Sequence, residues 1–112
     1  MLYIVNAFSL QMLPPETGRG LLTVERIDSE EASHLLTCRE WASAIGHADL
    51  AALVSADLEA DIKASRQSVT LDHCTELLVA QYRGPRLPEG TTQLPEGATI
   101  EYWRVNAVLT RY

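Results

Sequence analysis

The chain has 112 residues, of which 46% are hydrophobic and 21% charged, and its formal net charge is −6. These values are typical of one soluble globular domain that spans residues 1–112 and buries a core of modest depth. The acidic balance argues against a surface for duplex nucleic acid, because neutralising phosphates requires a basic face. The chain has no apolar stretch as long as a membrane span and no basic secretory leader, which predicts a cytoplasmic protein.

The chain begins with two predicted strands separated by a loop. Residues 2–8 form a nearly continuous run of apolar, β-branched and aromatic side chains, as in a strand that is covered on both faces. Residues 13–20 contain two prolines and two glycines, which predict a loop. Strand character resumes over residues 21–27.

Two helices and a short strand follow. Asp28 or Ser29 is suited to be the N-cap of the first helix, which has acidic residues in its first turn and is expected to end between residues 37 and 40. Residues 40–45 predict a short buried strand that Gly46 ends. From Ala48 onward the apolar side chains recur at helical spacing, which predicts the second helix.

The second half of the chain is dominated by predicted strands. Residues 59–63 and 66–71 alternate or are β-branched, which favours strands or strand ends. Residues 75–84 are interpreted as a strand, with a helix as the alternative, and residues 99–109 as a long closing strand. The expected fold is therefore α/β of the α+β type, a central mixed β-sheet with a few flanking helices.

The cysteines and histidines do not form a metal-binding pattern. Cys38 and Cys74 lie far apart without a CxxC motif, which favours two reduced thiols. The three histidines also lack the spacing of metal ligands. The sequence therefore predicts neither a metal site nor a cofactor.

The segment from Ser43 to His47, "SAIGH", joins a predicted strand to a predicted helix. The first turn of a helix has unpaired backbone N–H groups that attract anions, and small residues allow a ligand to approach the backbone. Ser43, Ala44, Ile45, Gly46 and His47 would then form a phosphate-facing corner, where the neutral imidazole is favoured and can take part in proton transfer. The alternative is that Gly46 only makes a turn and His47 only caps the helix.

Several segments resemble one known family in the same order along almost the whole chain. They are "YIVNAF" at the end of the first strand, "SAIGH" before a helix, a lone arginine before a strand, and "RLPEG" after the next strand. In these segments the chain is similar to the viral ring nucleases, the type III anti-CRISPR proteins of archaeal viruses, which have relatives in bacteria and mobile elements. The resemblance implies a homodimeric, metal-independent phosphodiesterase that cleaves cyclic tetraadenylate to linear diadenylates and so silences type III CRISPR signalling.

The resemblance also implies roles for individual residues. His47 is the expected catalytic residue, and Arg86 and Glu89 belong to the catalytic segment "RLPEG". Asn6 and Arg66 are expected to bind substrate, and the junction itself adds Ser43, Ala44, Ile45 and Gly46 to the expected binding residues. His47 would protonate the leaving 5′-oxygen while a ribose 2′-hydroxyl attacks the phosphate.

Some alternatives stay open in the sequence. "LPEG" occurs at 87–90 and again at 94–97, and each copy predicts a turn, so Glu96 competes with Glu89. Arg83 competes in the same way with Arg86. The protein could also be a dimer that captures a cyclic oligonucleotide or a short nucleic acid without cutting it, or a small interaction protein.

Overall fold

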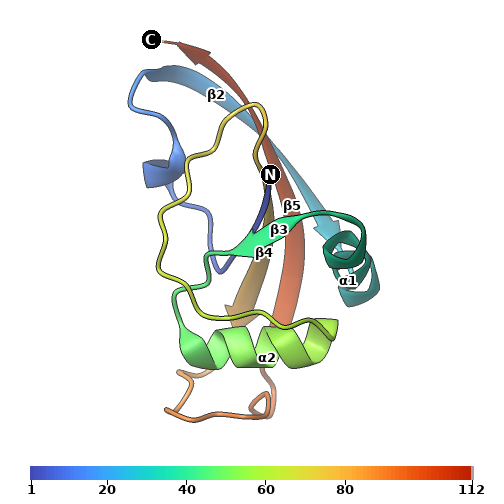
Figure 1. Cartoon of the computed structure of the whole chain (residues 1–112). Helices are drawn as coiled ribbons and strands as arrows, with labels where there is room; N and C mark the ends of the chain where they lie inside the picture. The colour runs from blue at the N-terminus through green and yellow to red at the C-terminus, as the bar shows by residue number, and fades with distance from the viewer. Residues whose placement is uncertain (112) are drawn as a thin grey trace.

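The apolar runs pair into one five-stranded mixed sheet in the computed structural model, which describes residues 1–111 (Figure 1). The strand order is β2-β5-β4-β1-β3. β1 pairs in parallel with β3 and β4, whereas β5 is antiparallel to both β4 and β2. The predicted mixed sheet is therefore confirmed. The strands are β1 (Leu2–Val5), β2 (Thr17–Ile27), β3 (Trp41–Ser43), β4 (Glu76–Arg83) and β5 (Thr99–Arg111).

Two helices cover one face of this sheet. In α1 (Ser29–Cys38) the N-cap is Asp28, whose Oδ1 accepts a hydrogen bond from the Glu31 amide at 2.8 Å. α2 (Ala48–Leu58) begins where the helical spacing predicted. The apolar sides of both helices pack on sheet residues such as Ile4, Leu78 and Tyr102. Within residues 1–111 neither helix is long and apolar enough to cross a membrane.

The opposite face of the sheet is covered by irregular chain. Val69 and Leu71 are buried there against Leu77 and Val79 of β4, and the Leu71 amide donates to the carbonyl of Met12 at 2.7 Å. Met12 ends η1 (Leu10–Met12), a single 3-10 turn.

The strands predicted over residues 59–63 and 66–71 are wrong, because neither segment joins the sheet. The alternating pattern arises because Ile62, Val69 and Leu71 are buried while their neighbours are exposed. An irregular extended segment can bury side chains in this way without strand-to-strand hydrogen bonds.

Other element boundaries also shift. The prediction of a loop over residues 13–20 is wrong from Thr17 onward, because β5 extends to Arg111 and pairs with β2 along this whole stretch. Gly20 fits this pairing since a Cβ at that position would lie only 2.9 Å from Cδ2 of Leu109. β1 and β3 are shorter than predicted, and the strand predicted over residues 75–84 is confirmed as β4, so the helix alternative there is wrong.

A buried carboxylate joins β4 to neighbouring elements. Glu76 is only 7% exposed, and its carboxylate accepts hydrogen bonds from Arg39, from Arg104 at 2.8 Å and from Asn106 at 3.2 Å. Burial raises the pKa of Glu76, but the hydrogen bonds from the two arginines outweigh it and hold the pKa below the ordinary value of 4.5. The ionised form of Glu76 therefore stabilises the fold.

We expect the free energy of unfolding to fall as the pH is lowered. The depressed pKa of Glu76 contributes stability that is complete above the unfolded value of 4.5 and is lost as the pH falls through the folded pKa. Urea unfolding between about pH 7 and 3 should show this loss in the native protein. The variant Glu76→Gln should be less stable at neutral pH and lose less stability on acidification.

The matched control is Glu40→Gln, which changes an exposed carboxyl. That variant should keep the pH dependence of the native protein. If the free energy of unfolding changed equally with pH in Glu76→Gln and in the native protein, the stabilising role of the ionised Glu76 carboxylate would be contradicted.

Candidate functional site

The site predicted from the sequence lies at one edge of the sheet. The carboxyl ends of the parallel strands β1, β3 and β4 meet at this edge, and β1 lies between the other two. In open sheets of this kind, ligands bind outside the carboxyl ends of the strands, next to a strand such as β1 whose two neighbours follow it on opposite sides. Figure 1 shows α2 and the orange loop of residues 84–98 at this end of the molecule.

A cavity of about 320 Å³ opens at this edge. It brings together Asn6, which follows β1, His47, which precedes α2, and Arg86 in the 84–98 loop. These three predicted site residues come from segments that are distant in the sequence. The complete lining is Asn6, His47, Leu50, Gln81, Tyr82, Gly84, Arg86 and Leu87.

His47 both caps α2 and faces this cavity. Its Nδ1 accepts a hydrogen bond from the Leu50 amide at 3.3 Å, so the capping interpretation is confirmed. The imidazole is nevertheless exposed and lines the cavity, so capping does not remove it from the site. Because Nδ1 accepts this bond, the neutral ring carries its proton on Nε2.

The backbone of the expected phosphate-facing corner is partly occupied by the fold. The Ala44 amide donates to the Ile4 carbonyl at 2.8 Å, and the Ile45 amide donates to Oγ of Ser43 at 3.3 Å. The side chain of Ile45 is fully buried in the core. Of the predicted corner, the amides of Ala44 and Ile45 are therefore engaged within the fold, whereas His47 lines the cavity and Ala44 lines a second, smaller one.

Arg66 lies beside this corner and outside the cavity. A Cβ at Gly46 would lie 3.6 Å from Cγ of Arg66, whose side chain is exposed. The adjacent Gln67 donates from Nε2 to the Ser43 carbonyl at 2.6 Å, which ties this segment to β3. A smaller cavity of about 160 Å³, lined in part by Asn6 and Gln67, adjoins the first one at Asn6.

The structure distinguishes between the competing arginines. Arg83 lies on β4 and donates from Nε to Glu101 at 2.8 Å, whereas Arg86 lines the cavity. The pKa of Glu101 is held below its ordinary value, chiefly by this hydrogen bond from Arg83. Arg83 is therefore engaged on the sheet, and Arg86 is the arginine that shares the cavity with His47.

The two LPEG turns lie at different places. The amide of Gly90, in the first turn, donates to Oδ1 of Asp49 near the start of α2 at 3.2 Å. Ala98, directly after the second turn, lines a different cavity. Glu89 therefore belongs to the turn next to the site, although its own side chain is exposed and does not line the cavity.

A family model described as STIV B116-like matches residues 2–103, which is almost the whole chain. The chain belongs to the STIV B116-like family. Among solved structures it is similar to B116 of Sulfolobus turreted icosahedral virus, with a TM-score of 0.78 and 24% sequence identity over 94% of this chain and 97% of that chain. This likeness shows a shared fold. Comparison with curated protein sequences gives no match.

The sequence interpretation of this B116-like chain missed five of the eight residues that line the cavity, namely Leu50, Gln81, Tyr82, Gly84 and Leu87, and it missed the contact made by Asp49. Gln81 contributes a side-chain amide to the lining, and Asp49 accepts a hydrogen bond from Gly90 in the neighbouring loop. Gln81 carries a signal in the sequence, since it is the first polar side chain after the apolar run from Leu77 to Ala80. Asp49 looks like an ordinary acidic residue in a first helical turn, so its contact with Gly90 has no local signal.

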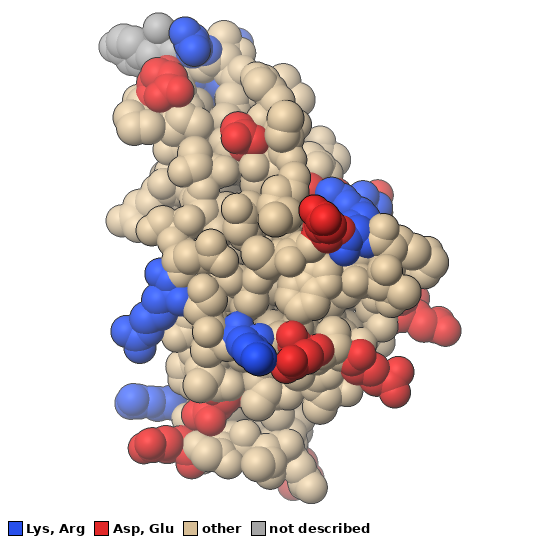
Figure 2. All heavy atoms as spheres, viewed as in Figure 1, with Lys and Arg blue, Asp and Glu red and all other residues tan. Residues whose placement is uncertain are grey.

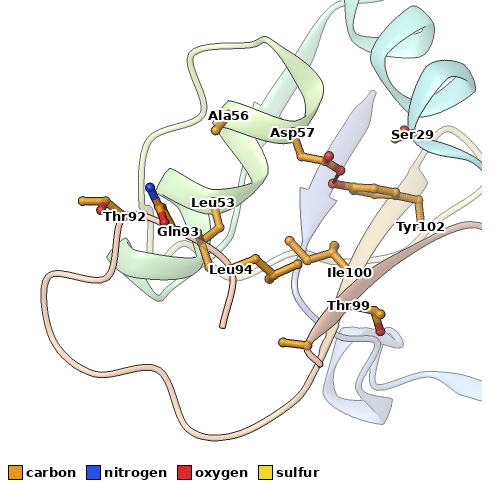
Figure 3. Close-up of a pocket in the computed structure, with 11 residues that line it drawn as sticks. Ser29, Leu53, Ala56, Asp57, Thr92, Gln93, Leu94, Thr99, Ile100 and Tyr102 are labelled. Atoms are coloured by element: carbon orange, nitrogen blue, oxygen red, sulfur yellow. Dashed lines mark hydrogen bonds between the residues drawn. The ribbon is translucent and has the colours of Figure 1, made fainter. Parts of the chain in front are cut away.

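A larger cavity of the B116-like chain lies elsewhere and contains none of the predicted site residues. It measures about 580 Å³ and is lined by apolar side chains from α2, β5 and the 84–98 loop, such as Leu53, Leu94 and Ile100 (Figure 3). Tyr102 donates from its hydroxyl to Asp57 at 2.6 Å, and burial together with this carboxylate raises the pKa of Tyr102. The one charged side chain in the lining is that of Asp57, which disfavours a phosphate ligand.

Charge and metal-ligand geometry set further limits on the site. On the face drawn in Figure 2, Lys and Arg side chains lie apart from one another and form no continuous basic surface. Among residues 1–111, no three His, Cys, Asp or Glu side chains are placed to hold a metal ion. Cys38 and Cys74 are both exposed free thiols, as the sequence predicts.

Proposed function

We propose that this B116-like protein is a ring nuclease that binds cyclic tetraadenylate and cleaves it to linear diadenylates, which would switch off type III CRISPR signalling. The observation that carries the proposal is the meeting of Asn6, His47 and Arg86 around one cavity at the carboxyl ends of parallel strands. These are three of the residues to which the family resemblance assigns roles. Their convergence from distant segments supports a common function.

The reaction uses a nucleophile that the substrate itself supplies. A ribose 2′-oxygen forms a bond to the adjacent phosphorus and loses its proton to water, while the bond from phosphorus to the 5′-oxygen breaks. The leaving 5′-oxygen takes a proton from the enzyme. Cleavage at two opposite phosphodiesters yields two diadenylates, each with a 2′,3′-cyclic phosphate and a 5′-hydroxyl. The protein must hold the groups in line and supply the proton.

His47 is the proposed proton donor. Only the doubly protonated imidazole is acidic enough for this task, and protonated Nδ1 can no longer accept the Leu50 amide bond. The imidazole must therefore leave its capping position when it becomes charged. A bound phosphate beside the ring favours that change, because it stabilises the imidazolium.

Arg86 is the proposed partner of the phosphate oxygens. Arg86 lines the cavity, and the planar fork of its guanidinium matches phosphate geometry. Arg66, which is exposed beside Gly46, is the proposed partner of a neighbouring phosphate of the same cyclic substrate. Glu89 is exposed in the turn after Arg86, and its proposed role is to orient an arginine or His47 rather than to attack the substrate.

A homodimer is part of the proposal. A cavity of about 320 Å³ lies at the small end of ligand sites, which run from roughly 300 to 1,000 Å³, and a ring of four nucleotides exceeds it. A four-nucleotide ring has a twofold axis, and a C2 dimer offers two identical half-sites around such an axis. Two copies of His47 would then face opposite phosphodiesters.

Capture of the ring without cleavage is the second candidate function. The observation in its favour is the hydrogen bond from the Leu50 amide to Nδ1 of His47, which holds the imidazole in a structural position. If the imidazole of His47 never leaves its capping position, Arg86 and Asn6 still bind the phosphate and ribose of the substrate. The two functions differ only in whether products form.

Incubation of the purified protein with cyclic tetraadenylate in EDTA is expected to yield linear diadenylates with 2′,3′-cyclic phosphate ends. Chromatography with mass detection identifies both products. A ring that stays intact but raises the melting temperature would establish capture, because a ligand that binds only the folded state stabilises it, by about 2.7 kcal/mol at 100 times its Kd. Neither cleavage nor a shift in melting temperature at large excess would overturn both functions.

A further inference from the structure

The 84–98 loop, which carries Arg86, is shaped largely by its own contacts. At its base, Gly84 and Ala98 pack so closely that a Cβ on Gly84 would lie 2.6 Å from the Cβ of Ala98. Each LPEG copy forms a turn with glycine at a φ of 80°, which a type II turn requires at its third position. The turns are closed by the amides of Thr91 and Ala98, which donate to Pro88 at 3.2 Å and to Pro95 at 3.0 Å.

These internal bonds set the shape of the loop, but they do not set its position relative to α2. The hydrogen bond from the Gly90 amide to Oδ1 of Asp49 at 3.2 Å does so directly, in addition to the packing of Leu87 on the core cluster that contains Leu50. Asp49 is half-buried in the first turn of α2, two residues after His47. Gly90 lies four residues after Arg86. The bond therefore links the helix that begins at His47 to the loop that carries Arg86.

We infer that Asp49 is a positioning residue that holds Arg86 opposite His47 before the substrate binds. This inference rests on the proposed function for the role of Arg86. Without the tether, the loop of fifteen residues keeps its internal turns, but the ligand itself must fix the position of the loop relative to α2, and that loss of conformational entropy lowers the affinity. The positive φ of Gly90 suits this arrangement, since it shapes the turn whose amide meets the carboxylate.

Two variants separate this role from the general effect of an acidic residue in a first helical turn. Asp49→Ala removes both the charge and the acceptor oxygen, whereas Asp49→Asn removes the charge and keeps an acceptor at the same distance along the side chain. If Asp49 acted only on the helix dipole, both variants would behave alike. If Asp49 positions the loop, the asparagine variant should keep most of the loop order and substrate affinity that the alanine variant loses.

The test combines hydrogen exchange with kinetics. In Asp49→Ala, amide exchange in residues 84–98 should become faster, and KM for cyclic tetraadenylate should rise on the order of three- to tenfold, as for the loss of one hydrogen bond. The kcat should change little, because the bound ligand reorders the loop and His47 is intact. Asp49→Asn should lie close to the native protein in both measurements.

Unchanged loop exchange in Asp49→Ala would overturn the inference, as would equal impairment of the alanine and asparagine variants. The two proposals fail in different ways. If the native protein neither binds nor cleaves the ring, the proposed function is wrong, and loop exchange in the two variants still decides whether Asp49 holds the loop. If the native protein cleaves the ring and KM is the same in all three proteins, only the positioning role is wrong.

Discussion

Replacing His47 by asparagine is expected to slow ring cleavage on the order of 10²- to 10⁴-fold while leaving the fold intact. That range is the usual contribution of a general acid. Asparagine is a good N-cap, so its side-chain oxygen can take over the Leu50 amide bond that Nδ1 of His47 accepts. It cannot donate a proton to a leaving oxygen. The variant therefore separates the two roles that this one side chain combines.

The matched variant is His47→Ala, which removes the cap as well as the proton donor. It should lose cleavage to the same extent and, in addition, about 1 kcal/mol of unfolding free energy. Single-turnover assays and urea unfolding of the native protein and both variants provide the measurements. Both variants should still bind the intact ring, since Arg86 and Asn6 remain. Cleavage by His47→Asn at the native rate would remove the imidazole from the mechanism.

Most of the fold could be predicted from local patterns. The helical spacing after Ala48 predicts α2, because it follows the apolar face that this helix buries. The acidic first turn after Asp28 predicts the start of α1, because such residues favour a helix N-terminus. Continuous apolar runs identified β1 and β4 in the same way. Residues 66–71 were misread since periodicity reports burial, and an irregular segment can bury Val69 and Leu71 as a strand does.

The candidate site was predictable only in part. The glycine and small residues before His47 indicated a junction of strand and helix, and the structure has this junction. The choice between Arg83 and Arg86 could not be made from spacing, because it depends on Glu101 of β5 pairing across the sheet with Arg83. The link between Asp49 and Gly90 is equally hidden, since it joins residues that are 41 positions apart.

Replacing Arg86 by alanine is expected to weaken binding of cyclic tetraadenylate by about 10- to 100-fold, the loss expected for hydrogen bonds to a charged group. Arg86→Lys should lie between this variant and the native protein, because lysine keeps the charge and loses the planar fork. Titration of the His47→Asn protein, which should bind without cleaving, measures Kd for each variant in that background. At higher salt the difference in Kd between Arg86→Ala and the parent protein should become smaller, because salt screens the charge of Arg86.

Arg83→Ala is the control for charge alone, since it removes an exposed arginine three positions earlier in the chain. Arg83 pairs with Glu101, and its side chain is 64% exposed. Arg83 does not line the cavity, so Arg83→Ala should bind the ring nearly as well as the parent protein. Glu101, whose side chain is 13% exposed, keeps Arg26 at 3.7 Å, so the variant should unfold at nearly the same urea concentration. If the two alanine variants lost affinity equally, the ring would be held by general positive charge near β4. A selective loss in Arg86→Ala would instead assign phosphate binding to the cavity that Arg86 shares with His47.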